Sequence, residues 1–317
     1  MLKYLVIPLA DDSVSFCHYS KGSQPDRLIS AAILKKAILW AAKENLNIQF
    51  LFPDYEIPKE HKDVINSVSH AIVASSECKD GLLRSKADII VFDTWDAINA
   101  YPLKTGVSYV IRSKKDVFFE NAKLLIKAIL SKADRLVVVI TDVDKFTSDD
   151  FEKYSHTLES LIPAVKDEYA KGRTVHLNLL TDRMLLEKMN NCNAGWESIT
   201  LAPNGKFYIC PAFYLDGSAP VGDLDNGFAI SNSPLYRLDH APLCRKCDAY
   251  QCRRCIWLNK KMTLEVNTPS HEQCVVAHLE RKASQKLLSE IRLMGNFLPG
   301  KDIPQLNYLD PFELFNN

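Results

Sequence analysis

Residues 136–150, LVVVITDVDKFTSDD, join the end of a buried strand to the start of a helix. Leu136–Thr141 is a run of apolar residues without polar alternation, which is typical of a parallel strand buried on both faces. Thr147 and the acidic residues after it form a helix start signal for the segment Ser148–Tyr169. The stretch therefore predicts a strand that leads through a short loop into an amphipathic helix.

The same order recurs through the first 180 residues. Strands are predicted at Tyr4–Leu9, Ile48–Phe52, His70–Ala74, Asp88–Phe92, Val107–Ile111, Leu136–Thr141 and Val175–Leu179. Between them, helical periodicity is clearest at Leu28–Lys43, Asp116–Leu130 and Ser148–Tyr169. Alternating strands and helices with short connections predict an α/β fold built on a parallel sheet or an open barrel, with ligands at the carboxyl ends of the strands.

The pattern changes near Asn190. From there to about residue 275 the chain is rich in Cys, Pro, Gly and Asp and has no long helical period. A last amphipathic helix is predicted at Val276–Leu293, followed by a proline-broken tail. We therefore predict a barrel over residues 1–185, a cysteine-rich domain over residues 186–276, and a C-terminal helix and tail over residues 277–317.

Composition excludes several classes of protein. The 317 residues are 47% hydrophobic and 25% charged, with a formal net charge of zero. Zero net charge argues against nucleic acid or an anionic membrane as the main partner. No apolar run has the length of a membrane span, and the start, MLKYLVIPLADDS, has no cleavage site of a signal peptide. We therefore expect a cytoplasmic protein without a membrane partner.

Cysteine is the unusual residue of this sequence. Seven of the nine cysteines lie between residues 192 and 274. These seven are Cys192, Cys210, Cys244, Cys247, Cys252, Cys255 and Cys274. Two C-x2-C pairs separated only by DAYQ predict metal binding, because a cytoplasmic protein keeps its thiols reduced.

The identity of the metal stays open at this point. A four-cysteine zinc site usually has a longer segment between its two pairs, whereas iron–sulfur clusters use thiolates from distant segments. Two sites of four ligands need eight ligands, and this region offers seven cysteines. One site is therefore either open to an external ligand or completed by another residue, for which His240, Asp248 and His271 are near enough in sequence.

Cys192, Gly205 and Cys210 follow the pattern C-x(9–15)-G-x4-C that opens a SPASM domain. The two C-x2-C pairs and Cys274 resemble the closing half of that domain, although the spacing inside and between the pairs departs from it. SPASM domains are C-terminal extensions of radical SAM enzymes that modify peptides and proteins, and they hold auxiliary [4Fe-4S] clusters. The segment ITLAPNGKFYICPAF resembles the small hairpin that carries the second cysteine of the domain.

The resemblance implies two ligand sets and one or two auxiliary [4Fe-4S] clusters. The first set is Cys192, Cys210 and Cys255, with one position open or filled by another group. The second set is Cys244, Cys247, Cys252 and Cys274. Zinc is the alternative metal.

The N-terminal half resembles the partial (β/α)6 barrel of radical SAM enzymes. That family binds its SAM cluster through C-x3-C-x-aromatic-C after the first strand, and the matching residues here are Ser13, Cys17, Tyr19 and Ser20. Serine is a poor iron ligand compared with a thiolate. The glycine-glycine-glutamate turn of the family is replaced by FPDYE. We therefore expect a degenerate SAM-cluster loop and no SAM bound in the usual way.

The segments Ser13–Ser20 and Thr268–Leu288 together resemble the CXXX repeat peptide maturase family. This resemblance implies maturation of a ribosomal precursor peptide with cysteine repeats, beside a companion modification enzyme. The sequence leaves open whether the protein is a catalyst or a substrate-binding partner, and no catalytic residue is assigned. A zinc-stabilised module that binds protein or nucleic acid is the alternative function, with nucleic acid disfavoured by the neutral net charge.

Overall fold

One large sheet organises the protein. The structure is a computed structural model that describes residues 2–22, 27–185, 192–241, 244–247, 249, 255–298, 300 and 302–303. In these residues eleven strands form a single sheet in the order β11-β10-β9-β8-β1-β2-β3-β4-β5-β6-β7. The strands are β1 (Tyr4–Pro8), β2 (Asn47–Leu51), β3 (His70–Ser75), β4 (Ile89–Phe92), β5 (Ser108–Ser113), β6 (Arg135–Ile140), β7 (His176–Leu177), β8 (Ser198–Leu201), β9 (Lys206–Tyr208), β10 (Gly222–Asp223) and β11 (Gly227–Phe228).

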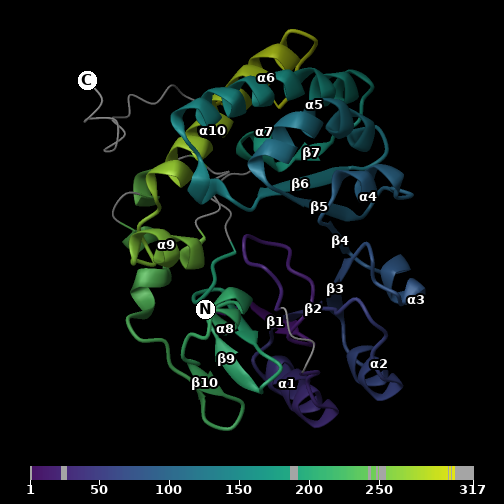
Figure 1. Ribbon diagram of the computed structural model, residues 1–317, viewed down its shortest axis with the longest axis vertical. Helices are drawn as coiled ribbons and strands as arrows, with labels where there is room; N and C mark the ends of the chain where they lie inside the picture. The colour runs from purple at the N-terminus through teal and green to yellow at the C-terminus, as the bar shows by residue number, and fades with distance from the viewer. Residues whose placement is uncertain are drawn as a thin grey trace.

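Helices connect the parallel strands and cover the outside of the curved sheet (Figure 1). The connecting helices are α1 (Ala31–Lys43), α2 (Lys59–Ile65), α3 (Gly81–Ser85), α4 (Trp95–Ala100), α5 (Lys115–Leu130), α6 (Ser148–Ala170) and α7 (Asn178–Leu185). Helix α8 (Pro211–Leu215) lies between β9 and β10, and α9 (Ile256–Thr263) and α10 (His271–Arg292) follow β11. Helix α6 packs between α5 and α10, and α10 also packs on α7. Within the described residues, no helix is both long enough and apolar enough to cross a membrane.

The predicted α/β class is confirmed by this topology. Strands β1 to β7 are mutually parallel in chain order, with β1 paired to β2 through Tyr4↔Asn47 and β5 paired to β6 through Ile111↔Val138. On its other side β1 pairs in parallel with β8, which begins the antiparallel extension β8–β11. The sheet thus continues from the barrel into the cysteine-rich region. The predicted boundary at residues 185–186 borders the undescribed residues 186–191 and stays a prediction.

The concave face of the sheet is lined by valine. Each of β1 to β6 contributes one or two small branched side chains to a single buried cluster. Its members are Val6, Leu51, Val73, Val91, Val110, Val137 and Val139, together with Val14 from the loop after β1. Phe16 from the same loop packs on the cluster. Neighbouring residues such as Leu5 and Ile7 face the helices instead, because successive side chains of a strand point to opposite faces.

Two predicted elements differ from the structure. The predicted strand Val175–Leu179 is only the two-residue β7, because α7 begins at Asn178. The Asn178 amide donates to the Val138 carbonyl and accepts the Val138 N–H, at 3.0 and 2.8 Å, which replaces the next pair of backbone bonds beside β6. The last helix begins at His271 and not at Val276, because Ser270 caps it by accepting the Gln273 N–H.

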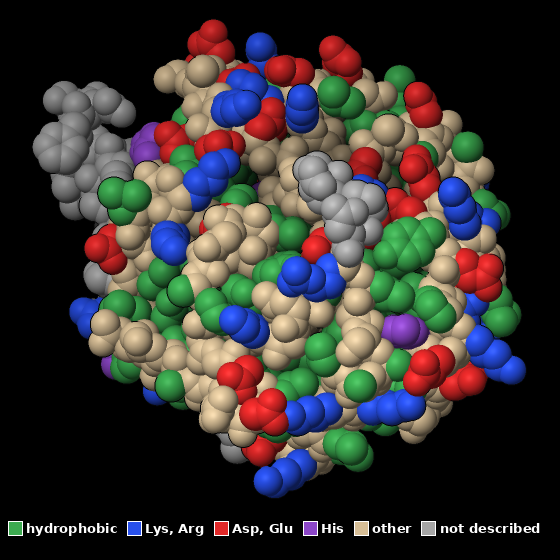
Figure 2. All heavy atoms as spheres, turned by 60° about the horizontal axis from the view of Figure 1, so that its bottom comes forward, with side chains coloured by type: hydrophobic (Ala, Val, Ile, Leu, Met, Phe, Trp, Pro, Cys, Tyr) green, Lys and Arg blue, Asp and Glu red, His purple; other side chains and the backbone are tan. Residues whose placement is uncertain are grey.

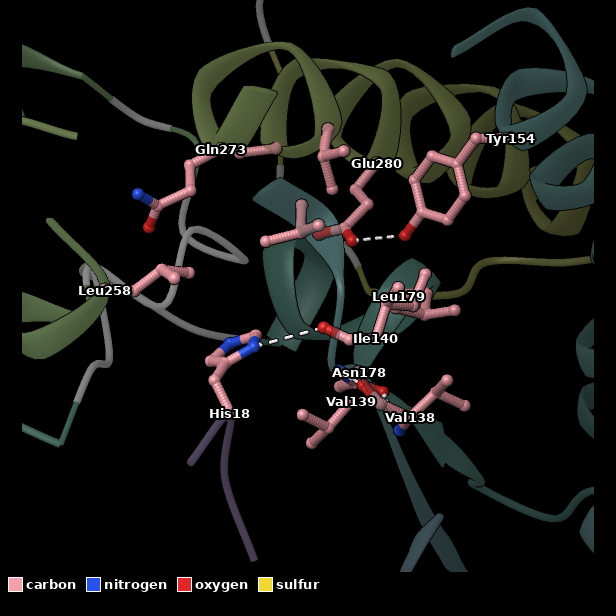
Figure 3. A pocket seen from close by; sticks show the side chains of 13 residues that line it. His18, Val138, Val139, Ile140, Tyr154, Asn178, Leu179, Leu258, Gln273 and Glu280 are labelled. Carbon is pink, nitrogen blue, oxygen red and sulfur yellow. Dashed lines mark hydrogen bonds between the residues drawn. The ribbon is translucent and has the colours of Figure 1, made fainter. Parts of the chain in front are cut away.

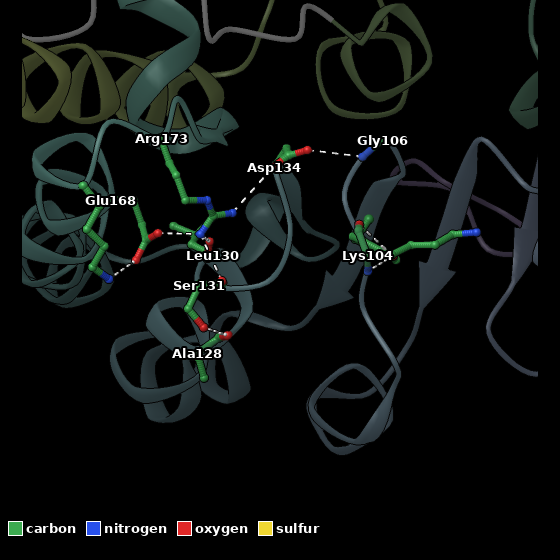
Figure 4. A network of polar contacts seen from close by, with 10 residues as sticks. Lys104, Gly106, Ala128, Leu130, Ser131, Asp134, Glu168 and Arg173 are labelled. Carbon is green, nitrogen blue, oxygen red and sulfur yellow. Dashed lines mark hydrogen bonds and ion pairs between the residues drawn. The ribbon is translucent and has the colours of Figure 1, made fainter.

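A polar network fastens the helices at the amino ends of β5 and β6 (Figure 4). The buried Glu168 carboxylate near the end of α6 accepts from Lys171 and Arg173. Arg173 also donates to the carbonyl oxygens of Leu130 and Ser131 at the end of α5. Asp134 pairs with Arg173 and accepts the Gly106 N–H in the loop that enters β5. This network lies at the amino ends of the strands, whereas the loop after β1 lies at their carboxyl ends.

A second buried ion pair ties the start of α5 to the start of α6. Thr147 and Asp150 form a capping box, with the Thr147 N–H donating to Asp150 at 2.9 Å. Lys115, the first residue of α5, donates to the same carboxylate. Burial raises the pKa of Asp150, but the hydrogen bonds from Lys115 and Thr147 outweigh it and lower the pKa to about 2.

We predict that Asp150→Asn destabilises the protein by about 2 kcal/mol at pH 7, since lowering the pKa from 3.8 to about 2 corresponds to that free energy. A lowered pKa in the folded state stabilises the fold above pH 4 and ceases to do so as the pH falls towards 2. The difference between Asp150→Asn and the wild type should therefore shrink over this range. Urea unfolding at pH 7 and at pH 3 measures both quantities.

The matched control is Asp167→Asn, which removes the exposed pair with Lys127 on the same two helices. It should cost at most about 0.5 kcal/mol, because an exposed ion pair is hydrated and screened. Equal losses in the two variants, or a loss for Asp150→Asn that is independent of pH, would contradict the prediction.

Candidate metal centre

The loop after β1 crosses the carboxyl ends of the strands (Figure 1). It begins with a turn in which the buried Ser13 hydroxyl accepts the Ala10 N–H at 2.8 Å. The Val14 N–H then donates to the Phe52 carbonyl at 2.9 Å, next to the end of β2. Farther along, Cys17 is half-buried, Tyr19 is buried and Ser20 is exposed.

Arg112 on β5 holds the far part of this loop. Its guanidinium donates to the carbonyl oxygens of Cys17 and Tyr19, at 3.0 and 2.7 Å, and to the Asp93 carboxylate at 2.8 Å. His18 between them lies 3.1 Å from the Ile140 carbonyl at the end of β6, through Nδ1. Sequence reasoning missed Arg112, although a single arginine inside an apolar strand is a detectable signal.

The residues of this loop do not fit the three-thiolate cluster of radical SAM enzymes. Cys17 offers a thiol, but the Ser13 hydroxyl is already engaged with the Ala10 N–H and Ser20 offers a hydroxyl. In the segment FPDYE after β2, Asp54 pairs with Lys21 from the same loop at 2.5 Å. We therefore derive no chemical step through SAM.

Three of the predicted metal ligands come together from distant segments. Ala194, Ile209, Phe213 and Ile256 form a small buried cluster of their own. These residues adjoin Cys192, Cys210 and Cys255 in the chain, and Cys210 itself packs on the cluster. Cys255 packs on the main core of the protein, and the thiolates of Cys255 and Cys192 both affect the pKa of Cys210, so the three residues lie in one neighbourhood.

Burial and the neighbouring thiolates both disfavour ionisation of these thiols. Burial raises the pKa of Cys210 well above its usual value, and the thiolates of Cys255 and Cys192 raise it further. Burial, followed by the thiolate of Cys192, raises the pKa of Cys255 to about 12. Three neighbouring thiolates are therefore costly unless a cation neutralises them, which is what a bound metal does.

Backbone donors partly offset this cost. Cys210 and Cys255 are the N-terminal capping residues of α8 and α9. The backbone N–H groups of Ala212 and Phe213 lower the pKa of Cys210, and those of Trp257 and Leu258 lower the pKa of Cys255. Backbone N–H groups near a sulfur favour its thiolate form, which is the form that binds a metal.

The other predicted ligands are placed less completely. Cys244 is buried in the short 3-10 helix η4 (Cys244–Lys246), and Cys247 follows it, with the Ala249 N–H donating to its sulfur at 3.4 Å. Cys274 lies in the first turns of α10, and Cys252 lies outside the described residues. Among the described residues, no three His, Cys, Asp or Glu side chains are arranged as ligands of one metal ion. This holds for Cys192, Cys210 and Cys255 as well, so both ligand sets stay predictions.

A pocket of about 80 Å³ adjoins this region (Figure 3). His18 lies on one side of it, and α10 contributes Gln273 and Glu280 on the other. The buried Tyr154 hydroxyl of α6 donates to the Glu280 carboxylate at 2.6 Å. The remaining walls are mainly apolar and include Leu258 of α9. The pocket thus lies between the loop after β1 and two helices. Helix α9 follows Cys255, and helix α10 contains Cys274.

Solved structures resemble this chain in shape. No family model matches the sequence, and no curated protein matches it. A structure of anSMEcpe with bound AdoMet and the Cp18Cys peptide superposes with a TM-score of 0.63 and 12% identity, over 92% of this chain and 100% of the other. A histidine-tagged anSMEcpe with bound AdoMet superposes with a TM-score of 0.61 and 11% identity over the same shares.

These matches show the fold. The chain has a radical-SAM-like α/β fold with a large, mostly parallel sheet, as the sequence predicts. Streptococcus suis SuiB bound to the precursor peptide SuiA matches over 78% of this chain and 67% of SuiB, with 14% identity and a TM-score of 0.40. That score is too low to support an argument. At such identities the similarity concerns the fold alone.

We predict that Arg112→Met loosens the loop after β1 without unfolding the barrel. The variant removes the donors to two loop carbonyls, so the amide hydrogens of residues 13–20 should exchange about tenfold faster or more. Hydrogen exchange followed by mass spectrometry reports each segment separately. Peptides from β5 and β6 should keep most of their protection.

The control for this prediction is Lys21→Met, which removes a partly exposed ion pair with Asp54 from the same loop. Its effect on exchange should be small, because such pairs contribute little. If both variants change exchange equally, or if Arg112→Met changes none of it, Arg112 does not hold the loop.

Proposed function

We propose that this protein is a cytoplasmic iron–sulfur protein that acts in the maturation of a ribosomal precursor peptide with cysteine repeats. The observation that carries this proposal is that Cys210 packs on a small core beside a radical-SAM-like barrel, in one electrostatic neighbourhood with Cys192 and Cys255. Because the loop after β1 lacks a thiolate set, the protein acts as a substrate-binding partner of a companion modification enzyme. A catalyst that works without the usual SAM cluster is the second version of the same function.

The proposed centre uses the chain's own groups in distinct roles. Cys192, Cys210 and Cys255 hold one cluster, and the backbone N–H groups at the starts of α8 and α9 stabilise two of the sulfurs. An iron–sulfur cluster supplies electron transfer when it is bound. Cys192 is exposed, so this side of the centre is open to a partner or a substrate. Cys244, Cys247, Cys252 and Cys274 hold the proposed second cluster.

A peptide substrate is supported by the shape matches and by the pocket. The anSMEcpe structures contain the Cp18Cys and Kp18Cys peptides, and they share the fold of this chain. The pocket beside His18 lies between the carboxyl end of β6 and the helices α9 and α10. Helix α9 follows Cys255, and α10 contains Cys274. Side chains of a peptide that lies across the strand ends would reach it.

A zinc-stabilised binding module is the alternative function. The N–H bond from Ala249 to the sulfur of Cys247 suits a C-x2-C turn on zinc as well as on iron. On the face in Figure 2, Lys and Arg side chains are interspersed with Asp and Glu, in line with the net charge of zero. Such a face does not offer the basic surface that nucleic acid requires. Together with the net charge of zero, this favours protein over nucleic acid as the partner of the zinc version.

We predict that anaerobically purified protein contains iron and sulfide, and that Cys210→Ser and Cys255→Ser each lower the iron content by the amount of one cluster. Loss of one thiolate leaves a weaker hydroxyl ligand, which iron–sulfur clusters disfavour. Iron, sulfide and zinc are quantified per chain in each variant. Zinc without iron in the anaerobic wild type would overturn the iron–sulfur proposal.

The matched controls are Cys17→Ser in the loop after β1 and Cys78→Ser in the buried core of the barrel. Both should retain the iron content of the wild type, because neither thiol belongs to a proposed ligand set. Loss of iron in Cys17→Ser would instead assign a cluster to the loop after β1 and contradict our interpretation of it.

We predict that the protein binds a synthetic peptide with cysteine at every fourth residue more tightly than the same peptide with serine at those positions. Calorimetry under anaerobic conditions compares the two. Incubation with the cysteine peptide and SAM should leave the peptide mass unchanged unless a companion enzyme is added. A mass change produced by this chain alone would contradict the partner version in favour of the catalyst.

A further inference from the structure

The end of strand β6 has an open hydrogen-bonding edge. In a parallel ladder, each residue directs its backbone N–H and C=O to one side, and the next residue directs its own to the other. The Thr141 N–H donates to the Ser113 carbonyl of β5 at 2.9 Å. The Val138 N–H and C=O bond the Asn178 side chain on the opposite side. Because Ile140 lies two residues after Val138, its N–H and C=O also point away from β5.

Strand β7 does not reach Ile140. The last pair between the two strands is Leu136↔Leu177, because α7 begins at Asn178. The Ile140 carbonyl oxygen lies 3.1 Å from Nδ1 of His18. The Ile140 N–H, by contrast, has no hydrogen-bond partner within the part of the chain that the structure describes, although the residue is only 6% exposed. Buried backbone donors are nearly always paired, so this N–H needs an acceptor from outside the chain.

The pocket of about 80 Å³ lies on this open side of β6 (Figure 3). Ile140 lines one wall, and Glu280 of α10 lines the wall across from it. In Figure 3 the Glu280 side chain extends from α10 towards the end of β6. Glu280 is 7% exposed, and its carboxylate accepts the Tyr154 hydroxyl at 2.6 Å. An apolar pocket with a few convergent polar groups at the carboxyl end of a parallel strand is typical of a ligand site.

The size and polarity of this pocket restrict its ligand. A volume of about 80 Å³ is that of about three water molecules, each of which takes roughly 30 Å³ in the liquid. A cation would pair with the Glu280 carboxylate but leave the Ile140 N–H without an acceptor. An anion would accept that N–H but lie near a carboxylate in mainly apolar surroundings. A small neutral group with both an acceptor and a donor satisfies both walls.

We propose that this pocket binds a primary carboxamide, whose oxygen accepts the Ile140 N–H and whose NH₂ group donates to the Glu280 carboxylate. A carboxamide combines an acceptor and two donors in a small, planar, uncharged group. The source of the carboxamide rests on the proposed function: it is the side chain of an Asn or Gln residue of the precursor peptide. The pocket thus adds a second selected residue to a peptide that is otherwise recognised by its cysteines.

Three small probes of the same shape test the chemistry of the pocket. Acetamide has a donor and an acceptor, acetate has acceptors and a negative charge, and acetamidinium has donors and a positive charge. Their binding to the full-length protein is measured by saturation-transfer nuclear magnetic resonance at one ionic strength. Acetamide should bind at least about tenfold more tightly than either ion, because each ion leaves one buried group unsatisfied. Equal affinities, tighter binding of an ion, or no binding of acetamide would overturn the proposal.

A variant that fills the pocket locates the binding site. Ala277 of α10 lines the pocket and is 3% exposed, so the larger side chain of Ala277→Leu would take the space of the ligand. Acetamide binding should be lost, while circular dichroism and thermal unfolding show that the fold is kept. The matched control is Ala128→Leu at an exposed position of α5, which should bind acetamide as the wild type does.

A second variant keeps the test valid if Ala277→Leu does not fold. Glu280→Met combined with Tyr154→Phe removes the acceptor together with its buried donor, so neither group is left unsatisfied. Acetamide should bind this double variant at least about tenfold more weakly. The control is Glu290→Met on the same helix, which removes a partly exposed pair with Lys166 and should keep the affinity of the wild type. Unchanged binding of acetamide by the double variant would overturn the proposal.

Peptides test the source of the carboxamide. A peptide with cysteine at every fourth residue and glutamine between the cysteines should displace acetamide from the wild type. The same peptide with glutamate in place of glutamine should not displace it. If neither peptide displaces acetamide, the link to the precursor peptide is overturned and the pocket is a site for a free amide.

Failure of this inference and failure of the proposed function give different results. A wild type that contains zinc but no iron refutes the iron–sulfur function, whereas the comparison of acetamide with the two ions does not depend on iron. A wild type that contains iron but does not prefer acetamide to the two ions refutes the carboxamide pocket alone.

Discussion

The position of the loop after β1 depends on a single arginine. Arg112 leaves water almost completely, with 11% of its side chain exposed, and such a charge is stable only where its donors are satisfied. Two loop carbonyls and the Asp93 carboxylate satisfy them. The same bonds hold Val14 and Phe16 of the loop over the valine-lined face of the sheet. The guanidinium thereby fixes the backbone of Cys17 and Tyr19 at β5.

Charge sets the second constraint on the molecule. Cys210 and Cys255 are buried at the starts of α8 and α9, where a few backbone N–H groups offset only part of the cost of ionising them. A small core of Ala194, Ile209, Phe213 and Ile256 fixes the surrounding segments. A metal at the proposed site would neutralise these thiolates and add to the stability of the region, because metal binding contributes to folding.

Much of the barrel is predictable because its signals are local. Strands such as Leu136–Thr141 are continuous apolar runs, and the start of α6 is marked by Thr147 and Asp150. The end of the barrel is less predictable. Asn178 and Thr181 satisfy backbone groups of Val138 and Leu177 with their side chains, so β7 stops after two residues. The apolar residues Leu177 and Leu179 give no indication in the sequence that side chains replace the backbone hydrogen bonds there.

The amino-acid sequence by itself determined the α/β class, the degenerate loop after the first strand, and the number and spacing of the thiols. It could not determine which thiols meet, because C-x2-C spacing constrains only neighbours. The tertiary structure decided that Cys192, Cys210 and Cys255 lie in one neighbourhood, and that Tyr19 in the loop after β1 is buried. Such proximity arises when β8 pairs with β1 and α8 packs on the loop. These contacts join residues about 200 positions apart, whose approach depends on the packing of whole elements.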